Sequence, residues 1–322
     1  MQSSGKSSAT VGAFLALSLV WGASFLFIKV GLGGLSPAQV VLGRILFGAA
    51  ALAVIMLVTR RRWPRELRVW AHLAVVGTTF CVIPFSLFAG AEQVLPSSLA
   101  SIYNATTPIM TLLLTPLVLR TERLDRARIA GLAIGIAGVV VLSGPWRLIG
   151  DADLSTTLPA QLACLGATLS YGFSGLYLRR FVSGLPYDAV TLASAQLAMA
   201  ALVSLLLAPF LAGGPVALSP AVVLSVTALG VLGTGVAYIW YTRVIREWGP
   251  VRASTVTYLT PVVGVVLGVL LLGEHVHWFE PVGGAIVILG ILTSQGMLHR
   301  RLARPLPPAT PAAKGPGEPV AR

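Results

Sequence analysis

The sequence predicts an all-α polytopic membrane protein with ten transmembrane helices, arranged as two inverted five-helix repeats. Three observations support this prediction: an apolar composition, ten apolar stretches of spanning length, and an internal repeat. Of the 322 residues, 56% are hydrophobic and 11% are charged, against about 25% charged residues in soluble domains. The net charge of +12 lies in short gaps between apolar stretches rather than on a water-facing surface, so nucleic acid is not an expected partner.

A spanning helix needs about 20 mostly apolar residues, because backbone polar groups cannot be left unpaired in hydrocarbon. Ten stretches meet this requirement, and the predicted spans are residues 11–31, 37–59, 69–90, 97–119, 125–144, 158–179, 187–211, 219–242, 249–272 and 279–298. They divide the chain into a short cytoplasmic N-terminus (1–10), a first five-helix repeat (11–144), an extracytoplasmic linker (145–157), a second five-helix repeat (158–298) and a disordered, proline-rich cytoplasmic tail (299–322).

The distribution of lysine and arginine predicts the orientation of the spans, since these residues are retained on the cytoplasmic side of short loops. Under the ten-span arrangement twenty of the 23 basic residues fall on one side, and the exceptions are Lys29, Arg44 and Arg147. We therefore expect a multi-pass protein of the inner or plasma membrane with both termini in the cytoplasm, and the lipid bilayer as its environment. Lys29, at a helix end, is expected to extend towards the outer headgroups.

The second half of the chain repeats the first. Because each unit has an odd number of spans, the second copy enters the membrane from the opposite face, as in the inverted repeats of secondary transporters. The pairs found at shifts of 150, 153 and 152 residues include Trp21 with Tyr171, Gly22 with Gly172, Ser24 with Ser174, Pro108 with Pro261, Gly131 with Gly283 and Gly138 with Gly290.

Two sets of short motifs resemble a known family. The first half contains Trp21-Gly22-Ala23-Ser24-Phe25, Lys29, Leu35-Ser36-Pro37 and Arg44, although Ser194 stands where the repeat would place a second arginine. The second half contains Pro250, Ala253-Ser254, Thr260-Pro261, the run from Leu270 to Glu274, Gly283 and Gly290. In their order and spacing, over roughly residues 11–298, these motifs resemble EamA-type permeases of the drug/metabolite transporter superfamily. The resemblance implies export or exchange of small metabolites, often amino acids and related compounds, through a central cavity lined by both halves.

Polar side chains gather on the fourth and ninth spans around two prolines. Pro108 leaves the carbonyl of Asn104 without its helical donor, and Pro261 does the same for Thr257. These carbonyls can bind substrate, or a neighbouring hydroxyl can satisfy them. With Pro108 and Pro261 as helix kinks, the expected substrate-binding residues are Trp21, Ser24, Arg44, Asn104, Thr107, Tyr171, Ser174, Tyr238, Thr257 and Tyr258.

Two of these candidates keep alternative roles. Arg44 lies within a span, where a cation is costly and faces the bundle interior. It can bind a substrate carboxylate, or it can bond helix carbonyls and hold the fold. Trp21 and Tyr171 can wall a cavity or serve ordinary packing.

The sequence indicates neither an enzyme nor a cofactor. No nucleophile with a base and no metal-ligand set occurs at workable spacing within a span, so no metal, cofactor or catalytic residue is expected. Glu92, Asp188 and Glu274, like the other carboxylates, fall at predicted helix ends or in loops, so a buried proton relay is not expected. A passive channel and a non-transporting membrane scaffold remain the alternative functions. Gly131-x-x-x-Gly135 and Gly264-x-x-x-Gly268 predict close helix crossings, within the chain or between copies in a homo-oligomer.

Overall fold

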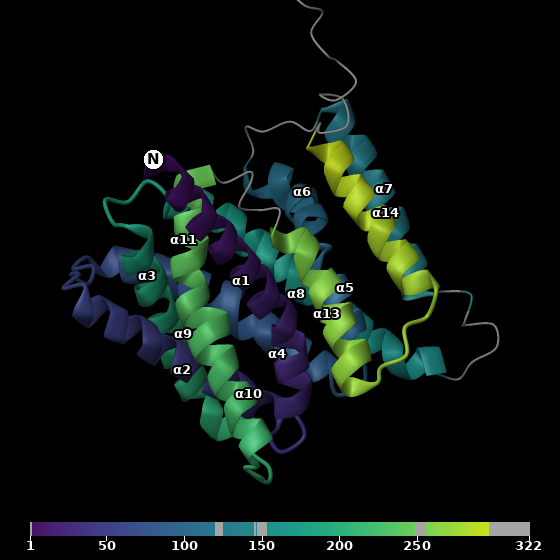
Figure 1. The fold of residues 1–322 in the computed structure, drawn as a ribbon, viewed down its shortest axis with the longest axis horizontal. Helices are drawn as coiled ribbons and strands as arrows, with labels where there is room; N and C mark the ends of the chain where they lie inside the picture. The colour runs from purple at the N-terminus through teal and green to yellow at the C-terminus, as the bar shows by residue number, and fades with distance from the viewer. Residues whose placement is uncertain (1, 120–124, 145, 147–152, 249–255, 296–322) are drawn as a thin grey trace, which may run out of the picture.

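The computed structural model describes residues 2–119, 125–144, 146, 153–248 and 256–295, and all regular elements in this part of the chain are helical (Figure 1). The predicted tail 299–322, and the motif residues Pro250 and Ala253-Ser254, lie outside the described residues. The helices are α1 (Gln2–Gly31), α2 (Pro37–Val58), α3 (Leu67–Gly77), η1 (Thr78–Val82), α4 (Ile83–Ala91), α5 (Ser97–Asn104), α6 (Thr107–Val118), α7 (Arg126–Ser143), α8 (Asp153–Phe181), α9 (Ala189–Leu211), α10 (Pro220–Gly230), η3 (Val231–Val236), α11 (Ala237–Trp248), α13 (Val256–Leu272) and α14 (Phe279–Ser294).

The long apolar helices fit a polytopic membrane protein. Within the described residues six helical segments are long and apolar enough to cross a bilayer: Ser8–Gly31, Pro37–Val58, Leu67–Ala91, Arg126–Ser143, Ala189–Leu211 and Pro220–Tyr241. Two shorter apolar helices, α13 and α14, follow them. Helix α1 starts well before residue 11, and α8 starts at Asp153, inside the segment expected to be a linker. Both differences lengthen a helix beyond its apolar stretch.

Pro108 divides the fourth predicted span into two helices. Helix α5 ends at Asn104 and α6 begins at Thr107, which places Pro108 in the first turn of α6, where a missing N–H costs little. The Thr107 hydroxyl donates a hydrogen bond of 2.8 Å to the carbonyl of Asn104. Of the two roles left open for this carbonyl, the structure shows the second, since the hydroxyl of a neighbouring threonine satisfies it. Pro261 differs, since α13 continues through it without a break.

Two short π-helical segments occur at positions that the internal repeat relates. The segment η1 lies between α3 and α4, and η3 lies between α10 and α11. They start at Thr78 and Val231, which are 153 residues apart, the same shift that relates Pro108 to Pro261. Segments of this type are rare and occur frequently at functional sites.

Helices from the two halves pack in matching pairs. Helix α1 packs against α13, α10 and α11, and α8 packs in the same way against α5, α6 and α4. Gly22 on α1 and Gly172 on α8 permit these approaches: an added Cβ would lie 2.5 Å from Cβ of Val263 at Gly22, and 2.8 Å from the amide nitrogen of Thr111 at Gly172. Helix α2 packs on α9, and α7 lies beside α14 at one flank of the bundle (Figure 1).

Glycines let α7 and α14 touch through their backbones. A Cβ atom on Gly131 would lie 2.5 Å from the carbonyl oxygen of Gly290, and one on Gly138 would lie 2.6 Å from the amide nitrogen of Val287. The close crossing predicted from Gly131-x-x-x-Gly135 is thus confirmed. Such contacts stabilise membrane bundles because lipid provides no hydrophobic drive between helices.

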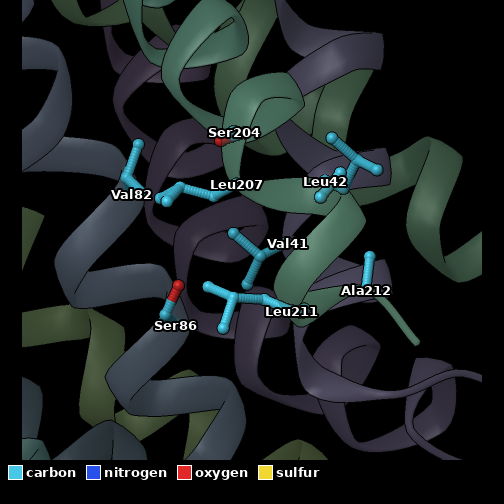
Figure 2. A pocket seen from close by; sticks show the side chains of 10 residues that line it. Val41, Leu42, Val82, Ser86, Ser204, Leu207, Leu211 and Ala212 are labelled. Atoms are coloured by element: carbon cyan, nitrogen blue, oxygen red, sulfur yellow. The ribbon is translucent and has the colours of Figure 1, made fainter. Parts of the chain in front are cut away.

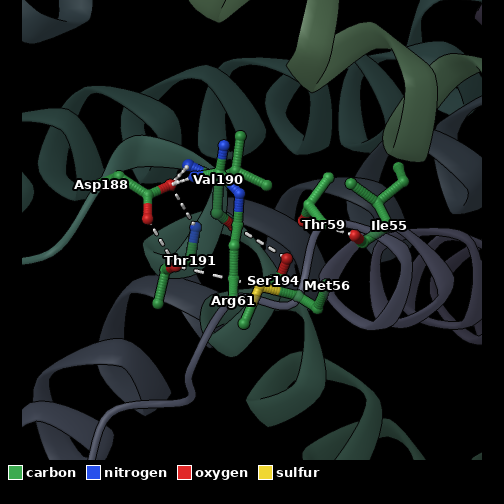
Figure 3. A network of polar contacts seen from close by, with 8 residues as sticks. All are labelled: Ile55, Met56, Thr59, Arg61, Asp188, Val190, Thr191 and Ser194. Carbon is green, nitrogen blue, oxygen red and sulfur yellow. Dashed lines mark hydrogen bonds and ion pairs between the residues drawn. The ribbon is translucent and has the colours of Figure 1, made fainter.

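Polar contacts join α2 and α9 at both ends. At the end where α2 stops and α9 starts, which we call the arginine end, Arg61 forms an ion pair with Asp188 (Figure 3). Asp188 also accepts hydrogen bonds from the backbone N–H groups of Val190 and Thr191, at 3.0 and 3.1 Å, and so caps α9. At the opposite end the side-chain amide of Gln39 donates to the carbonyl of Ala212 at 3.0 Å.

Lys29 lies at this opposite end, where its ammonium binds the protein backbone. Its ammonium donates to the backbone carbonyls of Glu92 and Leu95, at 2.5 and 2.9 Å, between α4 and α5. Carbonyls left unpaired where a helix ends are the partners of Lys29 in this structure, and its expected extension towards the outer headgroups stays a prediction. Lys29 ties α1 to the connection between α4 and α5.

Glu274 ties the second half to the first. It follows α13 and accepts hydrogen bonds from the backbone N–H groups of Ser97 and Ser98, at 2.7 and 2.8 Å, at the start of α5. Gly268 leaves room for the Glu274 side chain, because a Cβ added at position 268 would lie 2.4 Å from a carboxylate oxygen of Glu274. Burial opposes the charge of Glu274, but the hydrogen bonds from Ser97 and Ser98 outweigh burial and hold its pKa below the usual value. The charged carboxylate is therefore the form that this contact favours.

The α7–α14 contact gives a test of the packing. Gly138→Val should lower the free energy of unfolding by about 1–3 kcal/mol, since the new side chain meets backbone rather than flexible atoms. Gly175→Ala is the matched control, because nothing lies within 4 Å of its added Cβ, and it should leave stability unchanged or slightly raised. Thermal unfolding of the purified proteins in detergent measures both. Equal stability of the two variants would contradict the close crossing.

The Glu274 cap gives a second test, with a defined pH dependence. Glu274→Gln should destabilise the protein by about 1 kcal/mol at pH 7, because the charge-assisted cap of α5 is weakened. Because the pKa is lowered in the folded protein, the stabilising effect is present above the unfolded pKa of a glutamate and is lost as pH falls through the folded value. Thermal unfolding of wild type and variant should therefore differ at pH 7 and converge in acid. A difference that grows in acid would refute the cap.

Candidate functional site

The buried cation Arg44 lies at the centre of the candidate site. Arg44, on α2, is 8% exposed, and its guanidinium carbon lies 3.7 Å from the ring centre of Phe85 on α4. Its Nε donates to the hydroxyl of Thr234 in η3, at 3.3 Å. Within the described residues its two terminal amino groups form no hydrogen bond, to a helix carbonyl or to anything else. The arrangement therefore leaves most of the donors of a buried guanidinium available to a ligand.

Aromatic and amide side chains surround this cation. Tyr171 on α8 and Tyr238 on α11 pack against the buried apolar cluster that contains Phe85, Val41 and Ile45. The amide of Gln196 on α9 donates to the hydroxyl of Tyr238 at 3.4 Å and contacts the sulfur of Cys81 at 3.9 Å. Together with Thr234 and Phe85, these residues form what we call the Arg44 cluster. Seven different segments supply it, from both halves of the chain.

Members of the cluster are related by the internal repeat. Cys81 and Thr234 stand 153 residues apart, in η1 and η3, and so do Phe85 and Tyr238 in the helices that follow. Each π-helical segment thus supplies one residue of the Arg44 cluster from an equivalent position of the repeat. Arg44 itself has Ser194 as its counterpart, so the cluster carries its positive charge on one side only.

A small pocket borders the Arg44 cluster (Figure 2). It is partly open, with a cavity volume of about 30 Å³ between α2, α4 and α9, and its walls are mostly apolar, with the hydroxyls of Ser86 and Ser204 among them. Val41, one turn from Arg44, and Val82, next to Cys81, line it. A larger, open pocket of about 300 Å³ lies on the other side of α4, against the first turns of α8. Both pockets reach Ser86, so α4 separates them.

The other expected site residues form contacts of their own outside the Arg44 cluster, although a Cβ added at Gly233, next to Thr234, would lie 3.2 Å from the hydroxyl of Ser24. The ring of Trp21 packs on Tyr241 with centres 5.5 Å apart, Ser24 bonds the carbonyl of Val20 on its own helix, and Ser174 lies 3.5 Å from the carbonyl of Val76. Asn104 and Thr107 bond each other at the break between α5 and α6, Thr257 lies half-buried one turn before Pro261, and Tyr258 packs on Ile109, Val287 and Ile291. Of the ten expected residues, the structure brings together Arg44, Tyr171 and Tyr238.

Sequence reasoning missed several members of the site. Gln196 carries an amide into an apolar helix, and Thr234 stands between two glycines; both are signals that the sequence offered. Cys81 is buried beside Gln196. Glu92 was expected at a helix end and is also fully buried there. Within the described residues no three His, Cys, Asp or Glu side chains gather to hold a metal.

Comparison with known proteins places the chain among transporters. The inner membrane transporter YedA of Escherichia coli K12, itself named as uncharacterised, is 30% identical over 88% of this chain and 90% of its own. A probable amino-acid metabolite efflux pump of Salmonella typhimurium is 26% identical over 90% and 97% of the two chains. A probable terminal-alkyne amino-acid exporter of Streptantibioticus cattleyicolor is 27% identical over 96% and 100%.

Structural and family comparisons agree with these relatives. A solved crystal structure aligns with 92% of this chain and 99% of its own, with a TM-score of 0.61 and 21% identity, which speaks to the fold alone. The model of the EamA-like transporter family matches twice, over residues 9–144 and 158–294. This confirms the resemblance inferred from the motifs, and the chain belongs to the EamA-like transporter family.

Proposed function

We propose that the chain crosses the membrane ten times, as two inverted five-helix repeats with both termini and the arginine end in the cytoplasm. The double match to the family model, at 9–144 and 158–294, supports the duplication. The reciprocal packing of α1 and α8 and the 153-residue spacing of η1 and η3 support a pseudo-two-fold relation between the halves. The bias of arginine and lysine to one side supports the orientation.

Within this framework the protein acts as a secondary transporter that exports or exchanges small metabolites, with amino acids and related compounds favoured. The observation that carries the substrate class is the buried guanidinium of Arg44, whose terminal amino groups have no partner in the described residues. A buried cation of this kind is stabilised when an anion reaches it. The names of two relatives, an amino-acid metabolite efflux pump and an amino-acid exporter, point to the same class.

The chemistry of the Arg44 cluster suits a carboxylate with a second polar group. The planar guanidinium can hold both oxygens of a carboxylate at once, which gives orientation as well as affinity. Gln196 and the hydroxyls of Tyr171 and Tyr238 are amide and phenol groups that can bind an amine or hydroxyl on the same substrate. Phe85 covers one face of the guanidinium and limits water. The adjoining pocket at Val41 and Val82 has room for a small apolar group of the substrate.

Transport follows if the two halves take turns in closing the cluster. Residues of both halves surround Arg44, so a rocking motion of one half against the other would expose it to one side of the membrane at a time. The Arg61–Asp188 ion pair and the hydrogen bond from Gln39 to Ala212 hold α2 and α9 together. The contacts that change during transport would then be those of α1 and α8 with their neighbours. A passive channel would need a continuous path, and a scaffold would need no site.

Proteoliposome flux is the test of this function. Purified protein is assayed with a labelled panel of amino acids and related metabolites, with and without unlabelled compound inside. Saturable uptake of one compound that is stimulated by internal substrate identifies a carrier. Unsaturable flux without this stimulation identifies a channel, and silence across the panel removes amino acids as the substrate class.

Arg44 variants test the site. Arg44→Gln should lower kcat/KM for an anionic substrate at least about thirtyfold, which corresponds to about 2 kcal/mol for a buried charge-assisted contact. Arg44→Lys should retain part of the activity, because it keeps the charge but loses the bidentate geometry. Arg62→Gln, on an exposed arginine after α2, is the control and should transport like wild type. Equal flux from Arg44→Gln and wild type would exclude Arg44 from the site.

A further inference from the structure

The buried carboxylate Glu92 has no use in the site described above. Glu92 directly follows α4, its side chain is 0% exposed, and it lies at the end of the bundle opposite the arginine end. Both of its carboxylate oxygens are buried without a hydrogen-bond partner. A carboxylate that is charged, buried and unpaired is among the least favourable groups in a protein interior. The group must therefore be neutral here, or it must gain a partner in another conformation.

The ionisable groups around Glu92 leave it unpaired. Lys29 on α1 influences it electrostatically, but the Lys29 ammonium donates to the carbonyls of Glu92 and Leu95 and forms no ion pair with the carboxylate. Arg44 on α2 is the second cation that favours the charged form of Glu92, but its own contacts are with Thr234 and Phe85 in the Arg44 cluster. Glu274 repels the charge, and its own charge is already balanced by the start of α5. Cys164, buried on α8, brings no positive charge.

Two acids at the same end of the bundle thus have opposite environments. Glu274 accepts two N–H hydrogen bonds, and its pKa is held low. Glu92 accepts none through its side chain, and burial raises the pKa of its carboxyl well above the usual range, an effect that Lys29 only partly opposes. Such a divergence between neighbouring acids is typical of groups that exchange a proton in function.

We propose that Glu92 is a proton-binding site and that its protonation is linked to the transport cycle, an inference that rests on the proposed transport function. In the conformation described, the carboxyl holds a proton. Movement of α1 relative to α4 would free the Lys29 ammonium from the two carbonyls and bring it to the carboxyl. The O–H bond of Glu92 then breaks, the proton passes to water, and the carboxylate remains paired with Lys29. Substrate movement and proton release would thereby use the same displacement of α1.

Infrared spectroscopy of the purified full chain tests the proton without needing a substrate. At pH 7 wild type should show the C=O stretch of a protonated carboxyl, and this band should be absent from Glu92→Gln. Glu66→Gln, on an exposed acid before α3, is the control and should retain the band. Absence of the band from wild type, or its persistence in Glu92→Gln, overturns the proton site. Because wild type and control carry the decisive readout, a folding defect in Glu92→Gln does not obscure it.

Flux measurements then test the linkage. For one proton exchanged per substrate, a gradient of one pH unit should change substrate accumulation in wild-type and Glu66→Gln proteoliposomes by up to about tenfold. Glu92→Gln should lose this response to the gradient. A wild-type flux that ignores the pH gradient, or a Glu92→Gln flux that still follows it, overturns the linkage. If wild type moves no compound of the panel, the proposed transport function has failed, and the infrared result decides the proton site separately.

Discussion

Hydrocarbon offers no hydrogen-bond partners, so every polar group inside this bundle has to find its partner within the protein. Most of the structure follows from this constraint. The carbonyl freed by Pro108 is met by Thr107, and Lys29 meets the carbonyls left open where α4 ends. Glu274 meets the N–H groups left open where α5 begins. Each of these contacts satisfies a helix terminus or a helix break, and two of them also join helices distant in the sequence.

The same constraint explains how the two halves hold together. Because lipid is as apolar as a leucine side chain, the helices gain little by burying apolar surface and rely on close contact instead. Gly131 and Gly290 bring α7 and α14 into backbone contact, and Gly22 and Gly172 do the same for α1 and α8 with their partners. At these glycines a helix selects its partner by the shape of the contact surface rather than by the apolar area that is buried. The contacts occur in repeat-related pairs, as expected of a duplicated unit.

Among the described residues, the buried side chains that lack some or all of their partners include two ionisable ones, and both of these lie where function is proposed. The guanidinium of Arg44 has one protein hydrogen bond, and the carboxyl of Glu92 has none. One is a cation open to an anionic ligand, and the other is an acid that is stable here only with its proton. The hydroxyls of Ser97, Ser98 and Ser204 are also buried without a partner, and Arg44 and Glu92 differ from them because they can carry a charge.

The sequence by itself determined the membrane class, the internal repeat, the family and the close glycine crossings, because these depend on composition and on local spacing. It also singled out Arg44, Tyr171 and Tyr238 as site candidates, since a cation and repeat-related aromatics within apolar stretches are visible along the chain, and their role in a site stays a prediction. Only the tertiary structure decided which groups meet. Gln196, Cys81 and Thr234 join Arg44 through helices far apart in sequence, and the π-helical segments that present two of them have no clear sequence signal. Glu92 stands at a helix end by sequence, and only the packing of other helices over that end buries it, because burial is a property of neighbours rather than of position along the chain.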